Sequence, residues 1–258
     1  MKPLIGVNLY SVREHCRTEA DLEATLRRLK AIGYPSVQVS GIAPLPFPRV
    51  RELLDKAGLV ACAAHDNLEA LTQRPGEVIE KLRALGCHFT ALGYPGDEMM
   101  KPENLPLLRD QLTVAGKALA AAGLRLGYHN HAIEFAPIPG TTGPATSIYA
   151  WLYAQIPATV LGAEPDTAWI QAGGGSPSAW LRRLEGRVDA VHLKDYTWTP
   201  GRPQFCEVGH GNLDFDSIFA ALHETQVPIW IVEQDDPVPG RDIFDSLAMS
   251  FERVAREG

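Results

Sequence analysis

One local pattern recurs along the chain: an amphipathic stretch ends in a glycine, and a short apolar run follows it. Glycine directly after a helix can take the left-handed conformation that ends the helix, which lets the chain turn into a strand. The runs that follow are nearly continuous in apolar character, as is typical of strands covered on both faces. The pattern occurs at residues 29–33, 55–58, 83–86 and 120–123. It therefore predicts repeated units of a helix followed by a strand.

Extending this interpretation over the whole chain gives eight strands and eight helices in alternation. The predicted strands are 4–9, 36–39, 59–64, 88–92, 124–128, 160–163, 188–193 and 229–232. The predicted helices are 18–32, 49–57, 75–85, 103–122, 146–154, 177–185, 215–225 and 241–255. Such alternation implies right-handed crossovers and a parallel sheet. With 258 residues, the chain fits one (β/α)8 TIM barrel, so we expect a single α/β domain over residues 1–258.

The competing architecture is an open, doubly wound sheet. That fold normally carries a glycine-rich phosphate turn after its first strand, and residues 8–13 contain no glycine. The run Gly173-Gly174-Gly175 does not have the spacing of a dinucleotide-binding motif. The barrel is therefore the favoured fold.

Composition limits the partners of the chain. The 24 basic and 31 acidic residues give a net charge of −7, and the basic residues are scattered, which disfavours a nucleic acid partner. No stretch approaches the ~20 apolar residues of a membrane span. The N-terminus leads directly into an apolar strand, and the four cysteines form no CxxC pair. We expect a cytoplasmic protein with no membrane partner, and the sequence leaves a homo-oligomer open.

Polar side chains gather at the predicted C-terminal ends of the strands, where TIM barrels place their active sites. The residues at these ends are Asn8, Tyr10, Gln38, Ser40, His65, Asn67, His129, His131, Glu134, Glu164, Asp166, His192, Lys194, Asp195, Glu233, Gln234 and Asp235. Buried charges cost several kcal/mol unless they are paired or bound to a metal. Because four strands deliver a metal-type ligand at the same end, the set favours metal binding.

Single residues in this set have simpler interpretations. His65 alone could be a hydrogen-bonded wall residue, and Asp166 could cap the following turn. Glu233 could pair with Lys194 in an internal salt bridge. Lys194 and Asp195 could also belong to a solvated loop.

Read in order, the motifs at the strand ends resemble the sugar phosphate isomerase/epimerase family, whose fold is the xylose-isomerase-like barrel. The resemblance covers nearly the whole chain. The matching segments are Leu9-Tyr10-Ser11-Val12-Arg13, Tyr128-His129-Asn130-His131, Asp166-Thr167-Ala168-Trp169, His192-Leu193-Lys194-Asp195, Val232-Glu233-Gln234-Asp235 and the loop from Gly209 to Phe215.

The resemblance implies one divalent metal held by four side chains, usually Glu, Asp, His and Glu. Asp166, His192 and Glu233 occupy the last three positions, and His129 stands where the epimerases place the first Glu, with His131 as the alternative ligand. Trp169 stands where they carry a His that contacts substrate. These departures look more like the branch that contains inosose dehydratases and keto-glycoside-processing enzymes. The DNA-repair enzyme endonuclease IV shares the fold superfamily, but the acidic charge argues against that branch.

The function that the resemblance implies is a metal-dependent sugar or cyclitol isomerase, epimerase or dehydratase. Such an enzyme removes a proton next to a metal-bound carbonyl, and Lys194 would help to stabilise the resulting negative charge. The proton acceptor would be His131, with Glu134 or Glu233 as alternatives. Mixed nitrogen and oxygen ligands favour Mn²⁺, with Zn²⁺, Co²⁺, Fe²⁺ or Mg²⁺ as alternatives. We expect the substrate to contact Tyr10, His65, Trp169 and His210.

Loss of the first Glu removes one proton-transferring carboxylate of an epimerase. The sequence therefore favours lyase chemistry on a keto-polyol, with a ketose or sugar-phosphate epimerase or isomerase as the alternative. A sugar-binding barrel without catalysis is the alternative of another class.

Overall fold

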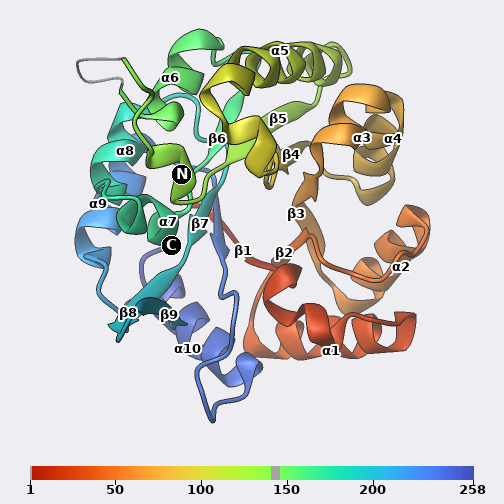
Figure 1. The fold of residues 1–258 in the computed structure, drawn as a ribbon. Coiled ribbons are helices and arrows are strands. Elements are labelled where there is room, and N and C mark those ends of the chain that lie inside the picture. Colours follow the sequence, from red (N-terminus) through yellow and green to blue (C-terminus); the bar gives the residue numbers. More distant parts are fainter. Residues whose placement is uncertain (1, 141–145) are drawn as a thin grey trace.

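The computed structural model describes residues 2–140 and 146–258. Eight parallel strands form one sheet in the order β6-β5-β4-β3-β2-β1-β10-β7. Isolated parallel bridges from Ala163 to Val188 and from Asp166 to His192 join its two edges, so the barrel is nearly closed (Figure 1). The strands are β1 Leu4–Asn8, β2 Ser36–Val39, β3 Val60–Asp66, β4 Phe89–Leu92, β5 Arg125–His129, β6 Gly162–Glu164, β7 Val191–Leu193 and β10 Ile229–Val232. The predicted TIM barrel is confirmed.

Helices surround the strands on the outside of the barrel (Figure 1). The α-helices are α1 Glu19–Ile32, α2 Phe47–Ala57, α3 Leu68–Gln73, α4 Pro75–Leu85, α5 Leu105–Ala121, α6 Ile148–Gln155, α7 Thr167–Ala172, α8 Pro177–Arg183, α9 Phe215–Thr225 and α10 Ile243–Ala255. Short 3₁₀ helices cover Leu9–His15, Asp97–Met100, Pro102–Asn104 and Ile133–Phe135. Each of the eight predicted helices is present, with ends displaced by at most a few residues.

Glycine ends two of the helices in the manner that the sequence predicts. Gly58 follows α2 with φ +69°, and Gly86 follows α4 with φ +66°. In both cases the glycine N–H donates to a carbonyl of the last helical turn. The left-handed conformation turns the chain back toward the sheet, where β3 and β4 begin.

The core has two parts. A large cluster of buried residues joins the barrel strands to the surrounding helices. A smaller cluster comprises Cys62, Ala63, Phe89, Ala91, Ala190 and Ile231, and Leu4 and Ile229, the first residues of β1 and β10, pack against it. The Phe89 ring takes the space beside Gly127, where a Cβ would approach it to 2.5 Å. Apolar packing therefore fills the N-terminal end of the barrel, and the polar side chains gather at the other end.

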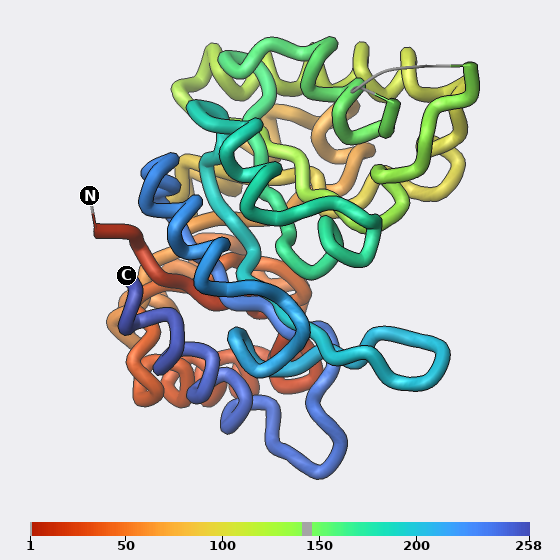
Figure 2. The backbone as a smooth tube through the Cα atoms, turned by 90° about the vertical axis from the view of Figure 1, so that its left-hand side faces the viewer, coloured from red at the N-terminus to blue at the C-terminus, as the bar shows by residue number. Residues whose placement is uncertain are grey.

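Besides the four 3₁₀ helices, the sequence did not predict α3, α7 or the strands β8 Asp195–Thr199 and β9 Arg202–Cys206. The helices α3 and α7 are single short turns, and the antiparallel hairpin of β8 and β9 interrupts the connection after β7. The hairpin projects from the barrel on the side opposite to the two chain ends (Figure 2). The interpretation of Lys194 and Asp195 as a solvated loop is wrong, because their exposed fractions are 1% and 0%.

Among the described residues, no helix is long and apolar enough to cross a membrane. The four cysteines are buried free thiols. Gly258 lies against Pro3 and Ile5, so the C-terminus closes onto the start of β1.

Candidate active site

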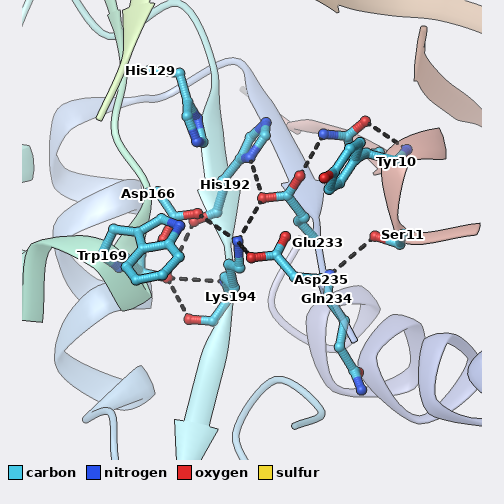
Figure 3. A network of polar contacts seen from close by, with 12 residues as sticks. Tyr10, Ser11, His129, Asp166, Trp169, His192, Lys194, Glu233, Gln234 and Asp235 are labelled. Carbon is cyan, nitrogen blue, oxygen red and sulfur yellow. Dashed lines mark hydrogen bonds and ion pairs between the residues drawn. The ribbon is translucent and has the colours of Figure 1, made fainter. Parts of the chain in front are cut away.

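Four side chains from neighbouring strands meet at the C-terminal end of the barrel. His129 ends β5, Asp166 follows β6, His192 lies in β7 and Glu233 follows β10. Each offers a nitrogen or carboxylate oxygen, and these atoms all lie within 4.8 Å of one another. We call this set the mouth cluster (Figure 3). The four side chains are buried, with exposed fractions of at most 5%.

The two carboxylate oxygens of Asp166 have different surroundings. Its Oδ1 accepts the backbone N–H of Trp169 at 2.9 Å and so caps α7. Its Oδ2 is buried without a hydrogen-bond partner among the described residues. Burial raises the pKa of Asp166 to about 7, although the charge of Lys194 opposes the shift. The capping role foreseen for this residue therefore occupies only half of its carboxylate.

His192 is held between two acceptors. Its Nε2 lies 2.7 Å from Gln38 Oε1, and its Nδ1 lies 3.0 Å from Glu233 Oε2. Gln38 turns its amide nitrogen to Glu164, so its oxygen must face the imidazole and accept a hydrogen bond from Nε2–H. A neutral His192 would then direct the lone pair of Nδ1 at the Glu233 carboxylate. That contact requires a cation between the two atoms, either a proton or a metal ion.

The charges around His192 agree with this geometry. Burial alone would lower the pKa of His192, but Glu164 and Glu233 raise it well above its ordinary value. Burial alone would raise the pKa of Glu233, but Lys194 and His192 lower it well below its ordinary value. In the absence of a metal ion, a proton on His192 therefore supplies the missing cation.

Glu164 lies beneath the mouth cluster, and its carboxylate contacts three imidazoles. One of its oxygens, Oε2, pairs with His65 Nε2 and lies 3.4 Å from nitrogens of both His129 and His192. His65, His129, Glu164 and His192 form a second set of potential metal ligands, which shares two members with the mouth cluster. Burial would raise the pKa of Glu164, but His192 and His65 lower it well below its ordinary value.

Lys194 is a buried cation among carboxylates. Its Nζ lies 2.6 Å from Asp235, 3.0 Å from Glu233 and 3.6 Å from Asp166. Burial would lower its pKa, but these carboxylates, Glu233 foremost, raise it above the ordinary value. The salt bridge between Glu233 and Lys194 is therefore present, and Lys194 carries a permanent positive charge beside the mouth cluster (Figure 3).

His131 and Glu134 take different positions. The His131 ring lines the cavity above the mouth cluster, 5.1 Å from the ring of His129. Burial and then the charge of Lys194 lower the pKa of His131 to about 4, so its imidazole is neutral near pH 7. The carboxylate of Glu134 accepts the Tyr128 hydroxyl at 2.9 Å and the His131 backbone N–H at 2.8 Å. Glu134 is fully buried, does not line the cavity, and fixes the backbone at His131 through the hydrogen bond from its N–H.

A cavity of about 510 Å³ opens over these residues. Tyr10, His65 and Trp169, three of the predicted substrate contacts, line it together with Tyr94 and Phe205. His210 is exposed and is not among the residues that line this cavity. The fold therefore brings together all the predicted site residues except His210, with Glu134 in the layer behind.

Comparison with known proteins agrees with this architecture. Residues 26–251 match the family described as the xylose isomerase-like TIM barrel. The chain belongs to that family. An inosose dehydratase from Clostridium beijerinckii is 23% identical over 86% of this chain and 84% of its own length.

Two solved structures show how widely the xylose isomerase-like barrel is shared. A sugar phosphate isomerase/epimerase from Parabacteroides distasonis has a TM-score of 0.82 at 19% identity, covering 98% of this chain and 97% of that one. A D-allulose 3-epimerase from Methylomonas sp., in complex with D-allulose, has a TM-score of 0.74 at 14% identity, covering 100% and 98%. At these identities, the likeness establishes the fold.

The sequence did not reveal how Gln38 and Glu164 act in this xylose isomerase-like barrel. Both were noted as polar residues at strand ends, but neither was assigned a role. Gln38 joins β2 to β6 and β7 through Glu164 and His192, which lie 126 and 154 positions away in the chain. The alternation of side chains along β2 could have shown only that Gln38 and Ser36 point to the same face.

Proposed function

We propose that this chain is a metal-dependent enzyme that acts on the carbonyl of a sugar or cyclitol. Two buried atoms of the mouth cluster support a metal site, because they have no hydrogen-bond partners among the described residues. They are His129 Nδ1 and Asp166 Oδ2. The contact between His192 and Glu233 needs a cation as well. Two imidazoles and two carboxylates are a common ligand set for a catalytic divalent ion.

His129, Asp166, His192 and Glu233 would hold the ion, and their mixed nitrogen and oxygen donors favour Mn²⁺ over the harder Mg²⁺. When bound, such an ion supplies Lewis-acid polarisation of a carbonyl and an adjacent hydroxyl. The second ligand set, through His65 and Glu164, is the alternative place for it. The mouth cluster is favoured because it includes Asp166, whose buried Oδ2 has no hydrogen-bond partner among the described residues, whereas the second set does not include this residue.

His131 is the best-placed proton acceptor. Its ring lines the cavity, its imidazole is neutral, and its Nδ1 has no hydrogen-bond partner among the described residues. Glu233 is engaged by Asn8, His192 and Lys194, and Glu134 faces Tyr128. Lys194, which also lines the cavity, would stabilise negative charge that develops on a substrate oxygen.

We favour dehydration over epimerisation. In a dehydration, the C–H bond next to the carbonyl breaks, its proton passes to His131, and a C=C bond forms as the β-hydroxyl departs with a proton as water. This sequence needs one acid–base group near the leaving hydroxyl. Epimerisation needs a second group on the opposite face of the substrate, and the usual Glu is replaced here by His129. The name of the inosose dehydratase relative supports this choice.

Incubation with keto-inositols, 3-keto-glycosides and free ketohexoses in D₂O with Mn²⁺, followed by NMR, tests the proposal. We expect deuterium at the carbon next to the carbonyl and loss of water or of the aglycone. His131→Gln should abolish both, and Ser217→Ala, at the exposed start of α9, serves as the folded control. Clean epimerisation of a ketohexose without elimination would replace the lyase with an epimerase. Saturable sugar binding without any deuterium exchange would indicate a binding protein.

A further inference from the structure

A second cavity, of about 350 Å³, lies beside the main one, and Ser40 and His65 line both. The second cavity lies between the loop after β2 and the helices α3 and α4. Its walls include Ile42, Leu45, Phe47, Ala70 and Val78. We call it the side groove.

The charged groups that line the side groove are already paired. Lys81 is 7% exposed and donates to Asp66 at 2.7 Å and to the His65 carbonyl at 3.0 Å. Asp66 also accepts the Thr90 hydroxyl, and Glu77 lies 3.4 Å from Arg74. The side groove therefore presents mainly apolar surface and no unpaired charge among the described residues.

The main cavity has no surplus of positive charge for a phosphate, even with the proposed divalent ion, whose charge is offset by its carboxylate ligands Asp166 and Glu233. Its lining cations are Arg13 and Lys194, and its lining anions are Glu233, Asp235 and Asp236. Lys194 is surrounded by carboxylates. Arg13 donates to the carbonyls of Tyr10 and Asp235 and stacks on the Tyr10 ring at 4.3 Å. A phosphorylated sugar would have to compete with these internal partners.

The main cavity is also larger than one sugar ring requires, since its volume falls within the range of roughly 300–1,000 Å³ that holds drug-sized ligands. From these observations, we propose that the substrate is an unphosphorylated sugar that carries an apolar, ring-sized substituent, and that the side groove binds this substituent. The proposal rests on the proposed function, because the sugar is placed over the mouth cluster. Beyond the proposed function, the side groove is a second binding site, and the main cavity discriminates against phosphorylated sugars.

Binding measurements with matched glycosides test the side groove. Isothermal titration of the Mn²⁺-loaded protein compares the methyl and phenyl β-glycosides of glucose, galactose and mannose, with glucose 6-phosphate as the charged probe. For at least one sugar, we expect the phenyl glycoside to bind about tenfold more tightly or better, because the ring leaves water. Glucose 6-phosphate should bind no more tightly than methyl glucoside.

Variants locate the effect. Ala70→Trp fills the side groove and should remove the phenyl preference while leaving the affinity for the methyl glycoside within about twofold. Ile42→Asn makes the wall of the side groove polar and should reduce the preference for the phenyl glycoside. It is the substitute test if Ala70→Trp does not fold. Ala20→Trp, on the exposed face of α1, is the matched control.

The outcomes are distinguishable. Equal affinities for methyl and phenyl glycosides, a preference that survives both groove variants, or tighter binding of the phosphate would overturn the side-groove proposal and leave the proposed function standing. A failure of every sugar to bind, together with no deuterium exchange in any keto-sugar, would overturn both.

Discussion

Two buried carboxylates at neighbouring strand ends have opposite surroundings. Asp195, just after β7, accepts the backbone N–H groups of Tyr196, Gly209, Gly211 and Leu213. Asp166, just after β6, leaves Oδ2 without a hydrogen-bond partner among the described residues, with only the Lys194 ammonium 3.6 Å away. Both side chains are 0% exposed. Burial of a carboxylate therefore does not identify its role, whereas the use of its oxygens does.

The contrast also explains a conspicuous loop. The segment from Gly209 to Asp214 packs against Asp195, and a Cβ at Gly211 would come within 2.2 Å of that carboxylate. Glycine at this position permits the close approach. The loop from Gly209 to Asp214 holds the base of the β8–β9 hairpin. This structural role accounts for the resemblance of the loop to a family motif. The predicted substrate contact of His210 stays a prediction.

The largest effect is expected from Asp195→Ala. Four backbone donors, buried at Tyr196 and Leu213 and only part-buried at Gly209 and Gly211, would lose their acceptor. Each buried donor left unsatisfied costs about 1–3 kcal/mol before the loop relaxes. We expect the free energy of unfolding to fall by about 3–5 kcal/mol, measured by urea denaturation. Asp214→Ala, which removes only the exposed cap of α9, should cost about 1 kcal/mol. A similar small loss at both positions would break the comparison.

Metal binding should give the next largest change. With Mn²⁺ or Zn²⁺ at roughly 100 to 1,000 times its Kd, the free energy of unfolding of the wild type should rise by about 3–4 kcal/mol. Glu233→Ala should lose this gain, because it removes one ligand and the acceptor for Asn8 and Lys194. Thermal unfolding with and without the ion, and with EDTA, measures both. An unchanged melting temperature of the wild type would refute a specific metal site.

Gln38→Met should weaken metal binding by about 10- to 100-fold, as is typical when a hydrogen bond that orients a ligand is lost. The amide of Gln38 fixes which nitrogen of His192 faces Glu233. Titration with a competing chelator measures the affinity, and one bound ion should remain at saturating metal. An affinity equal to that of the wild type would show that His192 does not need this contact.

His65→Ala separates the two possible metal positions. Because His65 belongs only to the set with Glu164, we expect the metal affinity to change by less than about tenfold. Glu164→Gln provides the companion measurement. A loss of more than about 100-fold in both variants would move the ion from the mouth cluster to the group around Glu164.

The smallest effect concerns the stability of the metal-free protein with Asp166→Asn. Asparagine can keep the cap on α7 through its side-chain oxygen, and Oδ2 makes no hydrogen bond that could be lost. The lost charge affects only a 3.6 Å contact with Lys194, which keeps Glu233 and Asp235 as closer partners. We expect the free energy of unfolding without metal to change by less than about 1 kcal/mol, while metal binding is lost. A loss as large as that of Asp195→Ala would show that Asp166 is structural.

The sequence predicted the site less completely than the fold. His129, Asp166, His192 and Glu233 could be grouped because each follows or ends an apolar run, and all such ends meet at one side of a parallel barrel. The same reasoning ranked His131 first as the proton acceptor and kept Glu134 as an alternative, and of these two only His131 lines the cavity. It also left out α3, α7 and the hairpin, whose segments are too short to show a clear period.

The order of residues along the chain was enough to predict the alternation of helices and strands, the glycines that end α2 and α4, and the end of the barrel where the polar side chains lie. These features depend on local conformation and on the spacing of apolar residues, which neighbours along the chain decide. The hydrogen-bond partners of the buried carboxylates became visible only in the folded chain. Glu164 contacts imidazoles from three other strands, Asp195 accepts four backbone N–H groups, and Asp166 Oδ2 has no hydrogen bond among the described residues. Glu164 finds its partners on other strands, and Asp195 finds most of its partners in the loop after the β8–β9 hairpin. Hydrogen bonding at such contacts has no period in the sequence.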